Sequence, residues 1–207
     1  MSRPDGVEST RGDVFQRLDL TASYPYSFGE YARRALWELV QATLIRYSWR
    51  RASGWRRFWL RRFGAVMPAT AGTKASTRIK HPWLFSMGEH SMIAEGVEVY
   101  NLGPVSVGSH TIVSQNAHLC NGTHDYRKPD LPLIRPTMRI GSGVWVCADA
   151  FVGPGVEIGN NAVVGARAVV MRSVPPGVVV SGNPARVIRA RVMEGLVGAP
   201  GGEREGD

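Results

Sequence analysis

Residues 140–175, IGSGVWVCADAFVGPGVEIGNNAVVGARAVVMRSVP, repeat with a period of six. An aliphatic residue opens each unit, at Ile140, Val146, Val152, Ile158, Val164 and Val170. A small or β-branched residue follows four places later, at Val144, Ala150, Val156, Ala162, Ala168 and Val174. The same period occurs earlier at Met87, Ile93 and Val99 and, after a slip of two residues, at Val107, Val113 and Leu119. This spacing fits neither a helix of period 3.6 nor a simple alternating strand.

A period of six predicts a parallel β-helix in which three repeats make one triangular coil. The aliphatic and small positions then fill the inside of a prism, because one six-residue unit cannot bury a side chain alone. The predicted coils are 87–104, 107–124, 140–157 and 158–175, with a less regular coil starting near Ile79. Residues eighteen apart after the loop should stack, so Trp145 lies against Val163 and Ala148 against Ala166. A β-sandwich with coincidental spacing is disfavoured by six unbroken units.

The repeat is interrupted once, by residues 125–139. Such a long excursion from a repeat scaffold is often functional, and Pro129, Pro132 and Pro136 restrict this one. His124 stands at the point where the loop leaves the coil. An imidazole with a reference pKa near 6.5 can take a proton from a hydroxyl near neutral pH, so His124 is a candidate general base. The other interpretation of a single histidine is a structural or surface residue, and we keep that interpretation for His81, His90 and His110.

The chain of 207 residues has a net charge of +8 and a pI near 10.1, and the excess charge is local. Residues 30–80 hold twelve Lys or Arg and two Glu. We therefore expect the following organisation: a flexible lead-in (1–25), a basic amphipathic helical segment (26–66), a β-helix (67–177), a closing segment (178–192) and a disordered tail (193–207). Cys120 and Cys147 lie on different predicted faces, so we expect a reduced, cytoplasmic protein without a disulfide.

Four stretches resemble a known family: NGTHDYR (121–127), VWVCADAFVGPGVEIGNNAVVGARAVV (144–170), VPPGVVVSGNPARVIR (174–189) and GWRRFWLRRFGA (54–65). They are similar to the hexapeptide acyltransferases of the maltose, galactoside and nodulation-factor O-acetyltransferase branch, and in particular to the colanic-acid-biosynthesis type. The resemblance implies a left-handed β-helix, a homotrimer with interfacial sites, and acetyl transfer from acetyl-CoA to a sugar hydroxyl in exopolysaccharide or capsule biosynthesis. No metal is expected.

The resemblance also implies roles for the acceptor site. His124 would be the general base, and the loop 125–139 would wall the acceptor site. Asp125 and Tyr126 on that loop, and Asn101 near a polar acceptor-binding position of the family, would contact the sugar. Trp145 would flank the reaction centre. Because His124 and Trp145 belong to different corners of one prism, the predicted site needs two neighbouring subunits.

For the donor, the resemblance places the pantetheine arm along the edge that carries Ala148 and Ala166. An amide near Ala148 is a candidate to stabilise the oxyanion. Arg186 and Arg189 would bind the phosphates of CoA, the alternative interpretation being simple surface charge. The sequence departs from the family at Cys147, where relatives commonly carry glycine, and at Met171-Arg172-Ser173, where relatives often have Thr-Lys-Asp.

The basic segment is predicted to form two amphipathic helices, with Leu36, Val40, Leu44 and Tyr47 at helical spacing. They either cap the first coil, which we favour, or lie through residues 30–63 on an anionic membrane; the uncharged runs are too short to span a bilayer. Nucleic acid binding is not expected, because no recognised module accompanies the charge. Rival functions are N-acylation of an amino sugar or serine-type acceptor, a γ-carbonic anhydrase with zinc on His118 and His124, and a non-catalytic β-helix.

Overall fold

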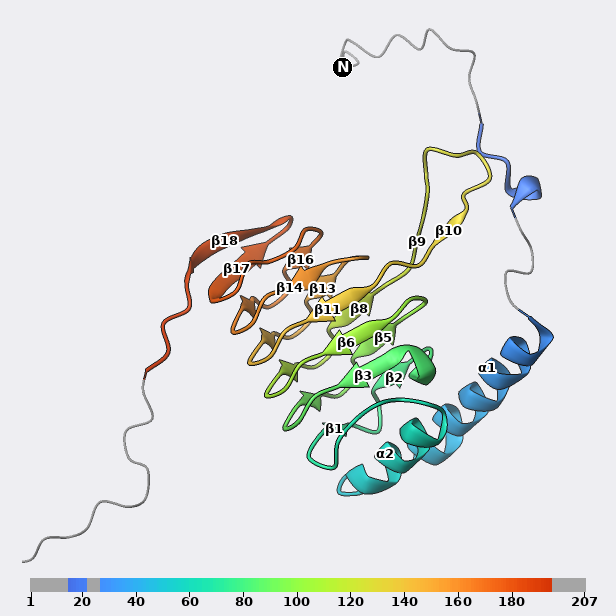
Figure 1. Cartoon of the computed structure of the whole chain (residues 1–207), viewed down its shortest axis with the longest axis horizontal. Helices are drawn as coiled ribbons and strands as arrows, with labels where there is room; N and C mark the ends of the chain where they lie inside the picture. The colour runs from blue at the N-terminus through green and yellow to red at the C-terminus, as the bar shows by residue number, and fades with distance from the viewer. Residues whose placement is uncertain (1–14, 22–26, 195–207) are drawn as a thin grey trace, which may run out of the picture.

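A computed structural model describes residues 15–21 and 27–194 of the chain. Three parallel sheets form the sides of a triangular prism (Figure 1). The seven-stranded sheet contains β1 (Gly72–Thr73), β4 (Met92–Ile93), β7 (Ile112–Val113), β12 (Trp145–Val146), β15 (Val163–Val164), β17 (Val178–Gly182) and β18 (Ala185–Ala190). The five-stranded sheet contains β2 (Arg78–Ile79), β5 (Glu98–Tyr100), β8 (His118–Cys120), β13 (Phe151–Val152) and β16 (Val169–Val170). The four-stranded sheet contains β3 (Phe85–Met87), β6 (Val105–Val107), β11 (Met138–Ile140) and β14 (Glu157–Ile158).

The strand register confirms the stacking predicted from the repeat. Beyond the loop, Trp145 pairs with Val163, eighteen residues on, but the last coil is two residues shorter, since Val163 pairs with Val179. Before the loop they are twenty apart, as in the pairing of Met92 with Ile112, which accounts for the two-residue slip. The first coil begins earlier than the predicted start near Ile79, because β1 at Gly72–Thr73 already pairs with β4. Its inward residues there are Ala71 and Thr73, which do not continue the aliphatic pattern.

The interior of the prism is a column of the side chains that the repeat predicts to be buried. The aliphatic positions Ile93, Val113, Leu119, Val146, Val152 and Val164 have no exposed surface, and neither do the small positions Ala117, Ala150, Ala162 and Ala168. Burial of each large aliphatic side chain stabilises the fold by roughly 1.5–3 kcal/mol. Stacked coils share this column, so the core runs the whole length of the prism.

Two hairpins depart from the parallel pattern. The inserted loop forms an antiparallel pair, β9 (Thr123–His124) with β10 (Leu133–Ile134), which projects from the prism (Figure 1). The pairing of Val105 with Met138 across this insertion confirms that the coil resumes after an extra segment. At the other end, β17 and β18 pair antiparallel and add the closing segment to the seven-stranded sheet.

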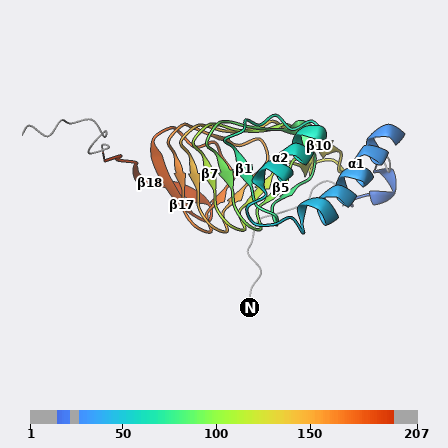
Figure 2. The ribbon, with the colours of Figure 1, turned by 90° about the horizontal axis from the view of Figure 1, so that it is seen from below.

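The helical segment covers the first coil, at the end of the prism opposite β18 (Figure 2). It contains α1 (Phe28–Val40), a π-helical stretch (Gln41–Ile45) and α2 (Ser53–Arg62), and short 3-10 turns occur at Leu18–Leu20 and Pro82–Leu84. Ser27 caps α1 by accepting a hydrogen bond from the amide of Glu30. The indole of Trp37 is fully buried and donates to the carbonyl oxygen of Ile79 at 2.7 Å. The predicted cap is therefore observed.

Arg56 ties α2 to the prism from a buried position. Only 1% of its surface is exposed, and its guanidinium donates to the carbonyl oxygens of Thr73, Trp49 and Arg50. Burial lowers the pKa of this side chain. A charged group can occupy such a position because these acceptors replace the water that it loses.

The remaining predictions about organisation concern the ends of the chain and the cysteines. The parts of the lead-in at 1–14 and 22–25, and the tail from 195 to 207, lie outside the described residues. Cys120 and Cys147 are both free thiols. Among the described residues, no helix is long and apolar enough to cross a membrane.

Candidate active site

The inserted hairpin is fixed to the prism at its root. Asn121 is fully buried, and its amide nitrogen donates to the carbonyl oxygens of Pro136 at 2.7 Å and Pro104 at 3.0 Å. Its amide oxygen accepts from the backbone of Gly155. Gly103 lies so close to the backbone of Pro136 that a Cβ there would overlap it. The two ends of the insertion are therefore held together, and the hairpin starts from a rigid base.

His124 lies on β9 of this hairpin, with its side chain exposed. Its Nδ1 is 2.6 Å from the carbonyl oxygen of Leu131. Because a carbonyl oxygen can only accept, Nδ1 carries the proton and the lone pair lies on Nε2. Leu131 itself has a positive φ of 46°, which is unusual for a residue with a branched side chain. The hairpin thus orients the ring so that its neutral form has the tautomer that a general base requires.

Asp125 and Tyr126 follow His124 toward the tip of the hairpin. The carboxylate of Asp125 accepts hydrogen bonds from the backbone and guanidinium of Arg127, which lowers the pKa of this carboxyl group. Tyr126 is 86% exposed. The first residue can therefore act as a hydrogen-bond acceptor, and the second offers an exposed ring.

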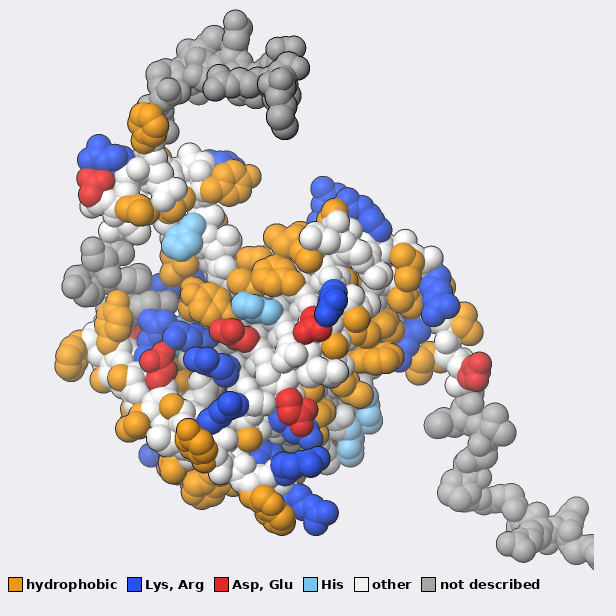
Figure 3. Space-filling model, turned by 180° about the vertical axis from the view of Figure 1, so that it is seen from behind, with side chains coloured by type: hydrophobic (Ala, Val, Ile, Leu, Met, Phe, Trp, Pro, Cys, Tyr) orange, Lys and Arg blue, Asp and Glu red, His pale blue; other side chains and the backbone are white. Residues whose placement is uncertain are grey.

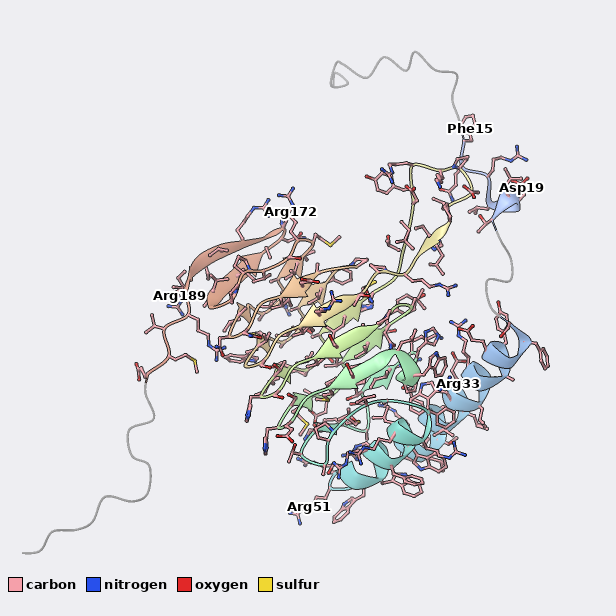
Figure 4. The ribbon with its side chains drawn as sticks, viewed as in Figure 1. Phe15, Asp19, Arg33, Arg51, Arg172 and Arg189 are labelled. Atoms are coloured by element: carbon pink, nitrogen blue, oxygen red, sulfur yellow. The ribbon has the colours of Figure 1, made fainter. Side chains whose placement is uncertain are left out.

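Residues 15–21, which are the described part of the lead-in, contact this hairpin. The backbone amide of Arg17 donates to the carbonyl oxygen of Pro129 at 2.8 Å. The hydroxyl of Thr21 donates to the backbone carbonyl oxygen of Asp130, also at 2.8 Å. Figure 4 shows Phe15 and Asp19 beside the hairpin tip. Residues 15–21 are therefore placed against the predicted acceptor wall, a contact that the sequence did not indicate.

Asn101 occupies a different kind of position from the one expected of a sugar-binding residue. Its side chain is fully buried, and its amide exchanges two hydrogen bonds with the backbone of His81. The ring of His81 is also buried, stacks on Trp83, and contacts the carbonyl oxygen of Asn101. We therefore assign Asn101 a structural role beneath the hairpin and do not include it among the acceptor contacts.

Ala148 and Ala166 lie on the edge between the seven-stranded and five-stranded sheets. The amide of Arg167 donates to the carbonyl oxygen of Ala148 at 2.9 Å, which stacks the two corners as predicted. The methyl side chains leave this edge open, so an extended ligand can approach the backbone there. Cys147 precedes Ala148 on the same edge and is half-buried, and burial raises the pKa of its thiol.

Trp145 and Arg189 come together in an open groove of about 520 Å³ on the seven-stranded sheet. The indole nitrogen of Trp145 donates to the hydroxyl of Ser114 at 2.9 Å, which fixes the ring. Arg191 also lines this groove, and its guanidinium donates to the carbonyl oxygen of Gly143. Arg186 lies near the turn between β17 and β18, outside the residues that line the groove.

His124 and Trp145 therefore belong to separate parts of one subunit. The hairpin leaves the edge between the five-stranded and four-stranded sheets, whereas Trp145 and Arg189 face outward from the seven-stranded sheet. His118, the other histidine of the zinc hypothesis, lies on β8 against the ring of Phe151. Among the described residues, no three side chains that bind metals form a cluster.

The repeats and the fold have counterparts among known proteins. The family described as bacterial transferase hexapeptide (six repeats) matches residues 137–172. A protein of Escherichia coli K12 named as an acetyltransferase of colanic acid biosynthesis, WcaF, is 39% identical over 172 residues, which cover 82% of this chain and 94% of WcaF. The chain belongs to the hexapeptide-repeat acetyltransferases. It is therefore an enzyme of the acetyltransferase class.

Two solved structures support the fold of this hexapeptide-repeat acetyltransferase. A maltose O-acetyltransferase from Clostridium difficile 630 superposes with a TM-score of 0.73 at 22% identity, covering 81% of this chain and 90% of that one. A hexapeptide-repeat acetyltransferase from Vibrio cholerae O1 biovar eltor, complexed with acetyl-CoA, superposes with a TM-score of 0.73 at 24% identity, covering 85% and 96%. The fold is the parallel β-helix that the repeat predicted, with the left hand that the family resemblance implied.

Proposed function

We propose that this acetyltransferase transfers an acetyl group to a hydroxyl of a saccharide, in exopolysaccharide or capsule biosynthesis. The observation that carries the proposal is His124, an exposed imidazole whose Nδ1 is bonded to the Leu131 carbonyl and whose Nε2 is left for a substrate, at the root of a hairpin that projects from the prism. The relatives add support, since WcaF is named for colanic acid biosynthesis and a galactoside O-acetyltransferase of Escherichia coli K12 is 31% identical over 132 residues.

In the proposed reaction, Nε2 of His124 accepts the hydroxyl proton while the acceptor oxygen forms a bond to the acetyl carbonyl carbon. Nδ1 keeps its proton and its bond to Leu131, which stabilises the imidazolium. The imidazolium then returns the proton to the sulfur of CoA as the C–S bond breaks, so no other reactant is needed. A backbone amide near Ala148 is the proposed donor to the oxyanion.

We propose a homotrimer in which each site lies between two subunits. The separation of His124 from the Trp145–Arg189 groove supports this arrangement, because one prism presents them on different sides. In the proposal, the pantetheine arm follows Ala148 and Ala166, Arg189 binds phosphate with Arg191 as an added candidate, and Arg186 adds charge at the rim. Asp125 and Tyr126, on the same hairpin as His124, contact the sugar.

Subunit mixing tests this arrangement directly. We expect His124→Ala and Trp145→Ala proteins each to have little activity, and the mixture, after dissociation and reassembly, to recover part of it. Recovery occurs only if one intact site can combine a wild-type His124 from one subunit with a wild-type Trp145 from another. A mixture as inactive as its components, from subunits shown by mass measurement to have exchanged, would contradict the interfacial site.

The acceptor is identified by following CoA release from acetyl-CoA with a panel of sugars, nucleotide sugars and lipid-linked glycans. The proposal predicts that hydroxyl acceptors are used and that the product contains an ester, which mild base removes. Release of CoA only with amino sugars, giving a base-stable amide, would replace the proposal with N-acylation. We place the reaction in the cytoplasm, where acetyl-CoA is made, with peripheral membrane contact proposed for residues 30–63.

A further inference from the structure

The outer face of the helical cap carries a dense positive charge. Residues 39–88 contain no Asp or Glu. Within this stretch, exposed or half-buried arginines stand at 46, 50, 51, 57, 61 and 62. Glu38, which precedes the stretch, is paired with Lys80 at 2.6 Å. The part of the cap that follows α1 therefore presents cations without acidic residues interspersed among them.

An apolar cluster lies within this positive surface. Trp49 is 71% exposed, Trp55 is 45% exposed and Phe58 is 53% exposed. The rings of Trp55 and Phe58 stack with centroids 6.2 Å apart, and the indole nitrogen of Trp55 donates to the carbonyl oxygen of Leu44 at 2.9 Å. Leu44 is itself 40% exposed. We call these exposed side chains, Leu44, Trp49, Trp55 and Phe58, the aromatic cluster; exposed apolar groups gathered in this way are typical of a surface that binds a partner or a membrane.

The cluster adjoins a hollow of about 440 Å³ lined by Gly54, Arg57, Phe58, Arg61 and Arg62. The guanidinium of Arg57 donates to the carbonyl oxygen of Ala71, and that of Arg61 to the carbonyl oxygen of Met67. These bonds hold both groups in place. Each guanidinium has five N–H donors, so donors remain for a phosphate in the hollow.

This surface also lies where binding would leave the candidate site open. Arg51 projects from the helical end of the molecule, whereas Arg189 lies on β18 at the opposite end (Figure 4). Figure 3 shows hydrophobic and cationic side chains next to one another over the helical end. A partner seated on the cap would therefore not cover the Trp145–Arg189 groove.

We propose that the helical cap is a docking surface for anionic phospholipid. The phosphate of a lipid headgroup occupies the arginine-lined hollow, and the aromatic cluster enters the boundary between headgroups and acyl chains, where tryptophan is favoured. Charge complementarity selects this occupant over a second copy of the chain, since two such surfaces would bring like charges together. The proposal gives the membrane contact specific residues and does not depend on the identity of the acceptor.

Sedimentation of the full-length protein with vesicles tests the proposal. We expect binding to vesicles of phosphatidylcholine containing 30 mol% phosphatidylglycerol, with release at about 0.5 M NaCl, and weak binding to phosphatidylcholine alone. Arg62→Gln should lower the partition coefficient about fivefold, since each arginine near an anionic surface contributes about 1 kcal/mol. Arg172→Gln, an exposed arginine at the other end of the prism, removes the same charge and should have little effect.

A second measurement reports insertion of the cluster. Phosphatidylcholine brominated on its acyl chains, mixed with phosphatidylglycerol, should quench tryptophan fluorescence, and the double variant Trp49→Phe, Trp55→Phe should lose most of this quenching. Trp37, Trp59, Trp83 and Trp145 remain in this variant and supply its residual fluorescence. CoA release with a soluble acceptor is measured for each variant. A variant that keeps this activity is folded, so its vesicle binding tests the docking surface separately from the proposed function.

Three outcomes would overturn the proposal. The first is no binding to anionic vesicles at low salt. The second is an equal loss for Arg62→Gln and Arg172→Gln, which would mean that net charge alone drives binding. The third is a lower oligomeric state for the double variant Trp55→Ser, Phe58→Ser, which would make the cluster a contact between copies of the chain.

Discussion

The Nδ1 of His124 lies 2.6 Å from the carbonyl oxygen of Leu131, across the hairpin that interrupts the repeat. This bond sets the tautomer and the orientation of the imidazole at once. The backbone at Leu131 adopts a left-handed conformation there, which costs on the order of 1 kcal/mol for a non-glycine residue. Strain of this kind persists where the surrounding structure enforces it, and it is often found at functional sites.

Replacing His124 with Ala should lower kcat by about 10²–10⁴, because the base that accepts the hydroxyl proton is lost. His90→Asn is the matched control, because His90 is a corner histidine with a positive φ that Asn tolerates, away from the hairpin. Steady-state CoA release gives both values. Wild-type rates for the Ala variant with the best acceptor would remove His124 from the mechanism.

Replacing Asn121 with Ala should destabilise the fold by about 3 kcal/mol, since it leaves buried partners on Pro104 and Pro136 unsatisfied. The root of the hairpin should loosen, and kcat should fall with stability. Asn160→Ala serves as the control because Asn160 is exposed and accepts a single hydrogen bond, from Ser142. Its expected cost is below about 1 kcal/mol. Urea unfolding measures the free energy of unfolding of both variants. Equal losses of stability would show that the hydrogen bonds of Asn121 at the root of the hairpin have no special role.

His81 should make stability fall as the pH is lowered. Burial, together with Arg34, Lys80 and Arg135, lowers the pKa of His81 from 6.5 to about 4 in the folded chain. The unfolded chain therefore takes up a proton below pH 6.5 that the folded chain refuses until about pH 4. Stability that is complete above pH 6.5 is lost progressively between these values, by about 3 kcal/mol.

The His81→Gln variant isolates this effect, because other titrating groups cancel in the comparison. Urea unfolding at pH 7.5 and pH 4.5 should show a smaller loss for the variant than for the wild type. The variant is expected to be less stable than wild type at pH 7.5, since it disturbs the stack on Trp83. Parallel losses in the two proteins would rule out His81 as the titrating group.

Cys147 should react slowly at neutral pH, and acetyl-CoA should protect it. Burial raises the pKa of this thiol, so little of the reactive thiolate is present near pH 7. Burial also raises the pKa of Cys120, which makes it an internal control. If the donor lies along Ala148 and Ala166, acetyl-CoA slows alkylation of Cys147 more than that of Cys120. Mass spectrometry after timed iodoacetamide treatment measures both rates, and identical protection would contradict the proposed donor path.

The six-residue repeat makes much of the fold predictable from the sequence. A period of six reports which side chains face inward, so it correctly predicts the stacking of Trp145 on Val163 and the extra segment after His124. The cap is also predictable, but its orientation is not. Of the predicted stripe only Val40 is buried, whereas Leu36, Leu44 and Tyr47 are exposed, and Trp37 and Ile45 join Val40 in the core. Periodicity identifies an apolar face of a helix without showing which face is covered.

The sequence by itself determined the coil, its register and the position of the interruption, because these follow from local burial repeated many times. The tertiary structure decided what the individual polar groups do. Asn121 binds the root of the hairpin, Asn101 binds the backbone of His81, and Arg191 binds Gly143, all through hydrogen bonds between residues distant in the sequence. Such contacts depend on where the chain returns in space, and one sequence carries no periodic signal of that return. His124 depends on both levels. The interruption of the repeat located it in the sequence, and only the tertiary structure showed that its Nδ1 bonds to the carbonyl oxygen of Leu131.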